Sequence, residues 1–171
     1  RPELIEAQLL LAQAYQSLGR LDDAAAVFRE QIKVSPQNAQ AHFLLGLFLL
    51  RQNKIEEARK AIEAAQQLAP ESLLPVAQLV DLDLRNNDFD AAFRQVRNQL
   101  QRTPESAGPY FLEGKIYAVQ GKWDNAETAL RKALELDPHS SSAYDLLISS
   151  FLAANRLPQA IAALEDLLSK R

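Results

Sequence analysis

The 171-residue chain contains no cysteine, no methionine, one tryptophan and only five glycines. The absence of cysteine excludes disulfides, thiol catalysis and cysteine-ligated zinc, and it suits cytosol and periplasm equally. The net charge is −3, from 19 basic and 22 acidic residues, and this argues against a nucleic-acid partner, which needs concentrated basic charge. The longest apolar run, from Phe43 to Leu50, has eight residues, whereas a membrane span needs about 18 or more. We therefore predict no membrane span.

A period of 34 residues organises the sequence. Five of the eight prolines share this spacing: Pro2, Pro36, Pro70, Pro104 and Pro138. Alanine recurs at the same period in all five copies: Ala24, Ala58, Ala92, Ala126 and Ala160. A fixed period of this length is typical of a stacked-repeat protein. The domain prediction is a single array, with repeats at about 3–36, 37–70, 71–104, 105–138 and 139–171.

Each repeat carries the pattern of two helices joined by a tight turn. Leu11, Tyr15 and Leu18 have the i, i+4, i+7 spacing of one helix face. Before each alanine stands a residue that readily takes the left-handed conformation of a helix end: Gly19, Asn53, Asn87, Gly121 and Asn155. After each proline that opens a new repeat, a residue suited to capping the next helix follows: Asn38, Ser72, Ser106 and Ser140. The fold prediction is all-α.

This pattern resembles the tetratricopeptide repeat (TPR) family, which has W-x₂-L-G-x₂-Y, then A-x₃-F, then P. The first repeat matches at Leu11, Tyr15, Ala24, Phe28 and Pro36, and the fourth matches at Gly114, Tyr117, Ala126, Leu130 and Pro138. The resemblance covers essentially the whole chain. It implies an α-solenoid of five helix-turn-helix repeats in a right-handed superhelix. It also implies a non-catalytic scaffold that binds a protein or peptide in a concave groove.

The amino-acid composition of the repeats, which are rich in Ala, Leu and Gln, is similar to that of long bacterial TPR arrays. These include exopolysaccharide-export and PEP-CTERM-type lipoproteins. We expect the chain to be a fragment of a longer array, because the next proline of the series would directly follow Arg171. Leu164, Leu167 and Leu168 would then leave an apolar C-terminal end, through which the chain could self-associate. No targeting segment is present, so no localisation is predicted.

In TPR proteins, the first helix of each repeat contributes to the lining of the concave groove. Mapping this groove onto the chain predicts these partner-binding residues: Phe43, Leu47, Leu50, Arg51, Asp81, Leu84, Arg85, Phe111 and Lys115. The apolar members would form a strip, and an exposed apolar strip marks an interaction site. Arg51 and Arg85 would flank it with positive charge. We therefore predict an amphipathic helix or an extended apolar segment as ligand. The alternative is that these side chains only pack between helices.

The third and fourth repeats place carboxylates where the other copies have core residues. Asp83 stands in a column of Tyr, Leu and Phe, and Glu113 stands in a column of leucines. A buried carboxylate must pair, protonate or reach water. One hypothesis is a locally rotated helix that lets both acids reach solvent, with Leu82, Leu84 and Leu112 filling the core. The others are a polar notch for a basic partner group and a metal site.

The sequence predicts no catalytic, cofactor-binding or metal-binding residues. His42 and His139 are far apart, and we expect the first to be a packing residue and the second to be a solvated loop residue. Glycines do not form a phosphate-binding loop. The function prediction is a protein-binding module. The alternatives are a structural spacer and a self-associating accessory subunit of a larger bacterial assembly, such as an exopolysaccharide export system.

Overall fold

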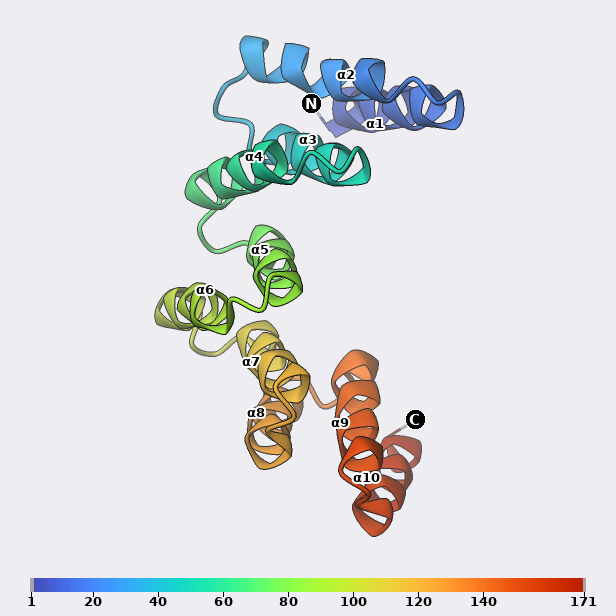
Figure 1. Ribbon diagram of the computed structural model, residues 1–171, viewed down its shortest axis with the longest axis vertical. Coiled ribbons are helices and arrows are strands. Elements are labelled where there is room, and N and C mark those ends of the chain that lie inside the picture. Colours follow the sequence, from blue (N-terminus) through green and yellow to red (C-terminus); the bar gives the residue numbers. More distant parts are fainter. Residues whose placement is uncertain (1, 171) are drawn as a thin grey trace. The chain divides into compact units, whose positions relative to one another are not determined.

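Ten helices make up the computed structural model over residues 2–170, with side chains described from residue 6 onward. The first helices of the five repeats are α1 (Pro2–Ser17), α3 (Ala39–Arg51), α5 (Leu73–Arg85), α7 (Ala107–Val119) and α9 (Ser141–Ala153). The second helices are α2 (Leu21–Val34), α4 (Ile55–Leu68), α6 (Phe89–Arg102), α8 (Trp123–Leu136) and α10 (Leu157–Ser169). Each repeat is a helical hairpin (Figure 1), as the sequence predicts.

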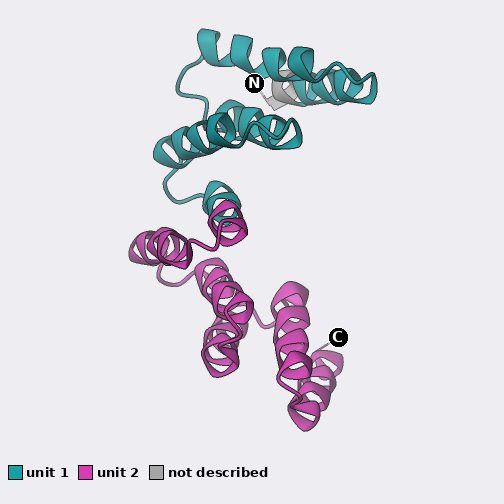
Figure 2. Ribbon diagram, in the orientation of Figure 1, with its two compact units in different colours: residues 1–79 teal, residues 80–171 magenta. Residues whose placement is uncertain are grey.

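The helices group into two compact units, residues 1–79 and 80–171, which are coloured separately in Figure 2. Unit 1 contains α1 to α4 and the first half of α5. Unit 2 contains the rest of α5 and α6 to α10. Within each unit, contacts connect helices that are neighbours along the chain, such as α2 with α3 and α8 with α9.

The turn between the two helices of each hairpin has the same backbone geometry in all five repeats. The Gly and Asn residues predicted for this position all have positive φ, from 57° at Asn87 and Asn155 to 72° at Gly19. In the first repeat, the N–H of Gly19 donates to the carbonyl of Gln16 (2.9 Å), and the N–H of Arg20 donates to the carbonyl of Tyr15 (2.8 Å). This is a Schellman motif, which satisfies carbonyls that the helix end would otherwise leave free.

The prolines with the 34-residue spacing mark a second type of turn, which joins one repeat to the next. The N–H of Asn38 donates to the carbonyl of Ser35 (3.1 Å), which places Pro36 second in a four-residue turn. The same bond closes the turns of Pro70, Pro104 and Pro138. Proline suits this position because its ring already fixes the required φ.

The predicted helix caps are confirmed at one position and wrong at two. The side chain of Asn38 accepts a hydrogen bond from the N–H of Ala41 (3.1 Å). Ser106 and Ser140 have the extended backbone of a cap, but their hydroxyls accept no capping bond. Pro75, Pro109 and Pro158 lie in the first turn of their helices, where a missing N–H costs little.

The recurring alanine is buried between the helices of each hairpin, and it is at most 2% exposed in all five copies. Opposite it, a Cβ on Gly46 would meet Cγ1 of Ile62 at 2.5 Å, and one on Gly114 would meet Cγ of Leu130 at 2.6 Å. The two helices therefore approach closely only because small residues alternate with large ones across the seam. In the third repeat, where Val80 replaces the glycine, the large residue is the smaller Val96.

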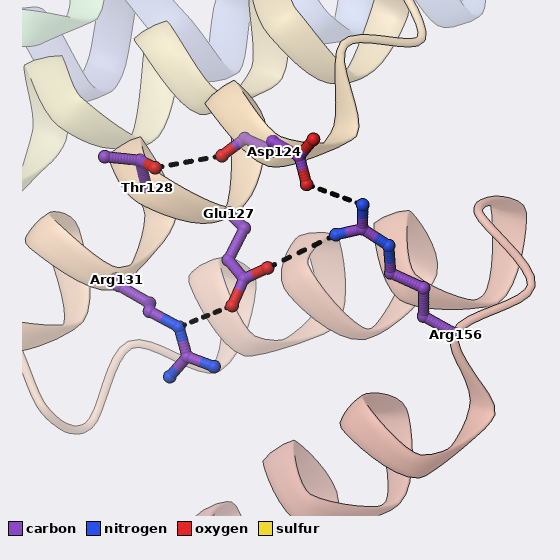
Figure 3. Close-up of polar contacts among 5 residues, drawn as sticks. All are labelled: Asp124, Glu127, Thr128, Arg131 and Arg156. Atoms are coloured by element: carbon purple, nitrogen blue, oxygen red, sulfur yellow. Dashed lines mark hydrogen bonds and ion pairs between the residues drawn. The ribbon is translucent and has the colours of Figure 1, made fainter.

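Ion pairs join consecutive second helices at a repeated position. Lys54 Nζ lies 2.8 Å from Asp22 Oδ1, and three repeats later Arg156 Nη2 lies 2.5 Å from Asp124 Oδ1. Figure 3 shows that Arg156 also reaches Glu127 (3.5 Å), which in turn contacts Arg131 (2.8 Å). Most of these side chains are well exposed, so water and salt screen the pairs and each contributes little to stability.

Candidate functional site

In unit 1, the predicted groove residues lie together on one face of α3. Phe43, Leu47 and Leu50 are each partly buried and partly accessible, and Arg51 is exposed. Leu50 packs on the core cluster formed by residues of α1 to α4. The three apolar side chains are therefore anchored at their bases and still present surface to solvent.

A pocket of about 400 Å³ opens beside Phe43. We call it the Phe43 pocket, and its lining consists of Ala39, Gln40, Phe43, Leu44, Ala65, Ala69, Ser72, Leu74 and Pro75. The lining is mostly apolar, and Leu74 at its edge is 63% exposed. A cavity of this size and polarity can hold one large apolar side chain of a ligand.

Arg51 is held by neighbours on two sides. Its guanidinium donates a hydrogen bond to the side chain of Gln16 on α1, and it lies 5.4 Å from the ring centroid of Phe48. The bond joins first helices of adjacent repeats, so equivalent faces of α1 and α3 are side by side. Arg51 thus presents its charge from a restrained position.

In unit 2, the structure joins two predicted groove residues directly. Lys115 Nζ donates a hydrogen bond to Asp81 Oδ1 at 2.5 Å, and each side chain is 34% exposed. Phe111 is half-buried against the core cluster that includes Leu130 and Phe151.

Two further predicted groove residues, both on α5, differ in exposure. Leu84 is only 9% exposed and belongs to the core, so it is not part of an accessible strip in this structure. Arg85 is exposed, and among the described residues it forms no ion pair.

The expectation that both unusual carboxylates reach solvent is wrong for Asp83. This residue is 2% exposed, because its position on α5 remains on the core face even though its side chain is an acid. Leu82 and Leu112 are buried as expected. Glu113 is half-buried, and desolvation raises its pKa while the charge of Arg97 partly offsets the rise.

Among the side chains that the structure describes, residues 6–170, no group of three or more His, Cys, Asp or Glu is placed to hold a metal ion. His42 is half-buried, with Nε2 2.9 Å from the carbonyl of Pro36, and His139 is exposed in its turn. In the same part of the chain, every helix is too short or too polar to cross a bilayer.

Sequence reasoning missed a hydrogen-bonded triad near the C-terminus. The buried Tyr144 donates its hydroxyl hydrogen to Asp166 Oδ2 (2.5 Å), and Lys170 Nζ donates to both groups at 2.7 and 2.8 Å. Lys170 first and Tyr144 second lower the pKa of Asp166, and Asp166 raises the pKa of Lys170. The i, i+4 spacing of Asp166 and Lys170 was the one available signal. The triad fastens α10 to α9.

Family models for the tetratricopeptide repeat match residues 9–72 and 107–140, which together are more than half of the chain. The chain belongs to the tetratricopeptide repeat family. No curated protein matches its sequence. Tetratricopeptide repeats form protein-interaction scaffolds and are typically non-catalytic, and this general role extends to the present chain.

Solved structures of other TPR proteins share the fold at low sequence identity. A thermophilic TPR protein of Thermus thermophilus is 23% identical, with a TM-score of 0.72 over 96% of this chain and 90% of that one. PilF of Pseudomonas aeruginosa is 16% identical, with a TM-score of 0.73 over 98% and 77%. MamA of Desulfovibrio magneticus RS-1 is 15% identical, with a TM-score of 0.67 over 97% and 94%. These similarities support the α-solenoid fold.

Proposed function

We propose that this chain binds an amphipathic helix or an extended apolar segment of a partner protein through the first-helix face around Phe43. The observation that carries the proposal is the Phe43 pocket, with the accessible side chains of Leu47 and Leu50 following on the same helix face. Their i, i+4, i+7 spacing matches the spacing of apolar anchors on a ligand helix.

The apolar contacts would supply most of the affinity. Burying one Leu or Phe side chain of a ligand contributes about 1.5–3 kcal/mol. Two or three such anchors contribute about 3–9 kcal/mol in total, and the entropy lost on association offsets at least about 4 kcal/mol of this, so we expect binding of roughly millimolar strength from these contacts. The pocket beside Phe43 is the natural position for the dominant anchor, because hot-spot side chains fill well-packed cavities.

A charged residue of unit 1 would orient the ligand. Arg51 follows Leu50 on α3, and its guanidinium is restrained by Gln16 and Phe48. We therefore expect the preferred ligand to carry acidic residues beside its apolar anchors, with binding that weakens as salt concentration rises.

The repeats themselves supply a test that preserves the fold. Other copies carry Ala77 at the position of Phe43, Gln13 at that of Leu47, and Gln16 at that of Leu50. The variant Phe43→Ala, Leu47→Gln, Leu50→Gln therefore introduces residues that the same scaffold already tolerates. Peptides selected from a random display library on the wild-type chain would be titrated against this variant, with helicity checked by circular dichroism.

The expected result is loss of binding by at least tenfold with helicity unchanged. A control variant, Ala26→Gln, changes an exposed position on α2 outside this face and should bind as the wild type does. Equal affinity of all three proteins would reject the proposal. A stronger variant, Phe43→Glu, separates the alternatives: lost helicity would support a packing role, and lost binding alone would support the groove.

A second candidate is self-association through α10. Four apolar side chains on one face of this helix are 43–68% exposed: Leu157, Ile161, Leu164 and Leu168. Their i, i+4, i+7, i+11 spacing forms a continuous stripe, and such a stripe on an isolated chain favours association. Light scattering over a wide concentration range tests this. A single monomer mass throughout, or no change on Ile161→Lys, Leu168→Lys, would reject it.

A further inference from the structure

A second pocket, of about 410 Å³, lies between α7 and α8 in unit 2. We call it the Glu113 pocket, and its lining consists of Tyr110, Glu113, Tyr117, Asn125, Thr128, Ala129, Lys132 and Glu135. Tyr110, Glu113 and Tyr117 share one face of α7, because they are spaced i, i+3, i+7. Phe111 and Lys115, which belong to the predicted groove, lie on a different face of the same helix.

The same pocket position occurs in unit 1 with different chemistry. A groove of about 510 Å³ there is lined by α3 residues His42, Leu45 and Leu49, each two repeats before its counterpart in the Glu113 pocket. The groove is therefore a property of the scaffold, whereas the carboxylate between two tyrosines belongs to the fourth repeat. Leu45 and Glu113 occupy equivalent repeat positions, so the unit 1 groove has an apolar side chain where the Glu113 pocket has a carboxylate.

Glu113 has a half-buried carboxylate that forms no ion pair with a residue that the structure describes. Among the described residues it makes no hydrogen bond or ion pair, and Arg97 acts on it only as a nearby charge. A partly buried carboxylate without a partner is unfavourable, and a cation placed beside it recovers the lost interaction with water.

The aromatic walls of the pocket fit a cation as well. The ring of Tyr117 packs against Phe93 of α6 with centroids 4.9 Å apart, which restrains its orientation. Aromatic faces attract ammonium and guanidinium groups, most strongly where water is partly excluded. The pocket's own lysine, Lys132, donates a hydrogen bond to Glu135 (2.9 Å) and forms no ion pair with Glu113.

We propose that the Glu113 pocket binds a lysine or arginine side chain from a basic peptide segment. The cation would pair with the Glu113 carboxylate, and its aliphatic stem would lie along Tyr110 and Tyr117. This site goes beyond the first-helix groove proposed above and does not depend on it. It would let the scaffold hold a basic segment on α7 in unit 2 and an apolar segment on α3 in unit 1.

The test uses three capped tripeptides, acetyl-Gly-X-Gly-amide with X as lysine, arginine or norleucine, titrated into the ¹⁵N-labelled chain. We expect the lysine and arginine probes, at millimolar concentration, to shift the backbone amides of Glu113, Tyr117 and Ala129. The matched amides of Leu45, Leu49 and Ala61 in the unit 1 groove should not move. The norleucine probe, with the same stem and no charge, should shift neither set.

Two variants identify the group responsible. Glu113→Gln keeps the shape and removes the charge, and it should weaken binding about tenfold or more, the usual scale for losing a charge-assisted contact in a partly desolvated site. Asp145→Asn removes an exposed carboxylate on α9, outside the pocket lining, and should bind within about twofold of wild type. Unfolding of either variant would appear as widespread loss of amide dispersion.

Several results would overturn the proposal. These are the absence of shifts at the pocket amides, equal shifts with norleucine, equal binding by Glu113→Gln, or shifts confined to exposed acids such as Asp22. The outcome is separable from that of the groove, because Phe43→Ala, Leu47→Gln, Leu50→Gln leaves every lining residue of the Glu113 pocket unchanged. That variant should bind the lysine probe normally.

Discussion

Asp81 on α5 and Lys115 on α7 occupy the same position in consecutive repeats, and their side chains meet at 2.5 Å. The bond shows that residues separated by one repeat in sequence become lateral neighbours on the first-helix face. Equivalent positions of consecutive repeats therefore form a row of neighbouring side chains on this face. Opposite charges in such a row pair with each other, as Asp81 and Lys115 do, and this reduces the charge that a ligand meets.

The Asp81–Lys115 pair should make a small, salt-sensitive contribution to stability. Both side chains are about one-third exposed, so we expect a coupling free energy of about 0.3–1 kcal/mol. A double-mutant cycle with Asp81→Asn and Lys115→Gln, followed by urea unfolding, measures it. The coupling should decrease in high salt. A coupling that is larger and independent of salt would mean that the pair is more desolvated than the structure indicates.

Gly46→Ala should destabilise the second hairpin. The added Cβ would meet Cγ1 of Ile62 at 2.5 Å, a contact that requires a shift of one helix. Overpacking of this kind costs about 1–3 kcal/mol, partly offset by about 1 kcal/mol of improved helix propensity. Chemical unfolding should show a net loss, and adding Ile62→Val should recover part of it. If the double variant were no more stable than Gly46→Ala, the close approach would not be the cause.

The Asn residues in the hairpin turns should tolerate glycine better than alanine. Asn87 has a φ of 57°, in the left-handed region that alanine avoids. Asn87→Ala should therefore cost about 1 kcal/mol, while Asn87→Gly should be close to neutral. The same comparison at Asn53 and Asn155 is an internal replicate, because all three turns share one geometry. Thermal unfolding of the six variants measures their stability. Alanine variants as stable as the glycine variants would contradict this expectation.

Glu113→Leu should stabilise the chain at neutral pH, because it restores the leucine of the other repeats and removes a desolvated carboxylate. Burying the added apolar surface contributes about 1 kcal/mol. Burial raises the pKa of Glu113, so the folded state binds more protons than the unfolded state between the ordinary and the raised pKa. The free energy of unfolding of the wild type therefore falls as pH rises through that window.

The advantage of Glu113→Leu should consequently shrink as the pH is lowered through the window, since protonation neutralises the wild-type side chain. Unfolding titrations of both proteins at neutral and mildly acidic pH measure this. Asp145→Leu, at an exposed position of α9, provides a control at a carboxylate that is not buried. An advantage that did not change with pH would indicate that apolar packing alone accounts for the stabilisation.

The helices and turns were predictable from the sequence because each depends on local chemistry repeated five times. Gly19 and Asn53 can serve the same turn, and Pro36 can open the next repeat, whatever the packing around them. The groove was less predictable. Leu84 follows the same periodicity as Leu50, yet it is 9% exposed, because accessibility depends on how adjacent repeats pack.

The Glu113 pocket was also beyond sequence reasoning, although Glu113 itself was recognisable as an exception. A residue that departs from the repeat pattern shows that the chemistry of its position has changed. The sequence does not show whether that side chain faces a cavity, a neighbouring residue or water. The pocket exists because α7 and α8 present Tyr110, Tyr117 and Ala129 to the same space, and that arrangement depends on tertiary packing. For Asp83, packing led to the opposite outcome, a carboxylate within the core.

The Schellman turns have a consequence for how the chain folds and opens. Each turn closes a hairpin in which the contacting residues are at most one repeat apart in sequence. Closing such a short loop costs little conformational entropy, so each hairpin should form fast. Hairpins with only local partners can also detach one at a time. Protection from native-state hydrogen exchange should therefore decrease from the interior of the chain toward its ends, with stability distributed over the hairpins instead of residing in a single cooperative transition.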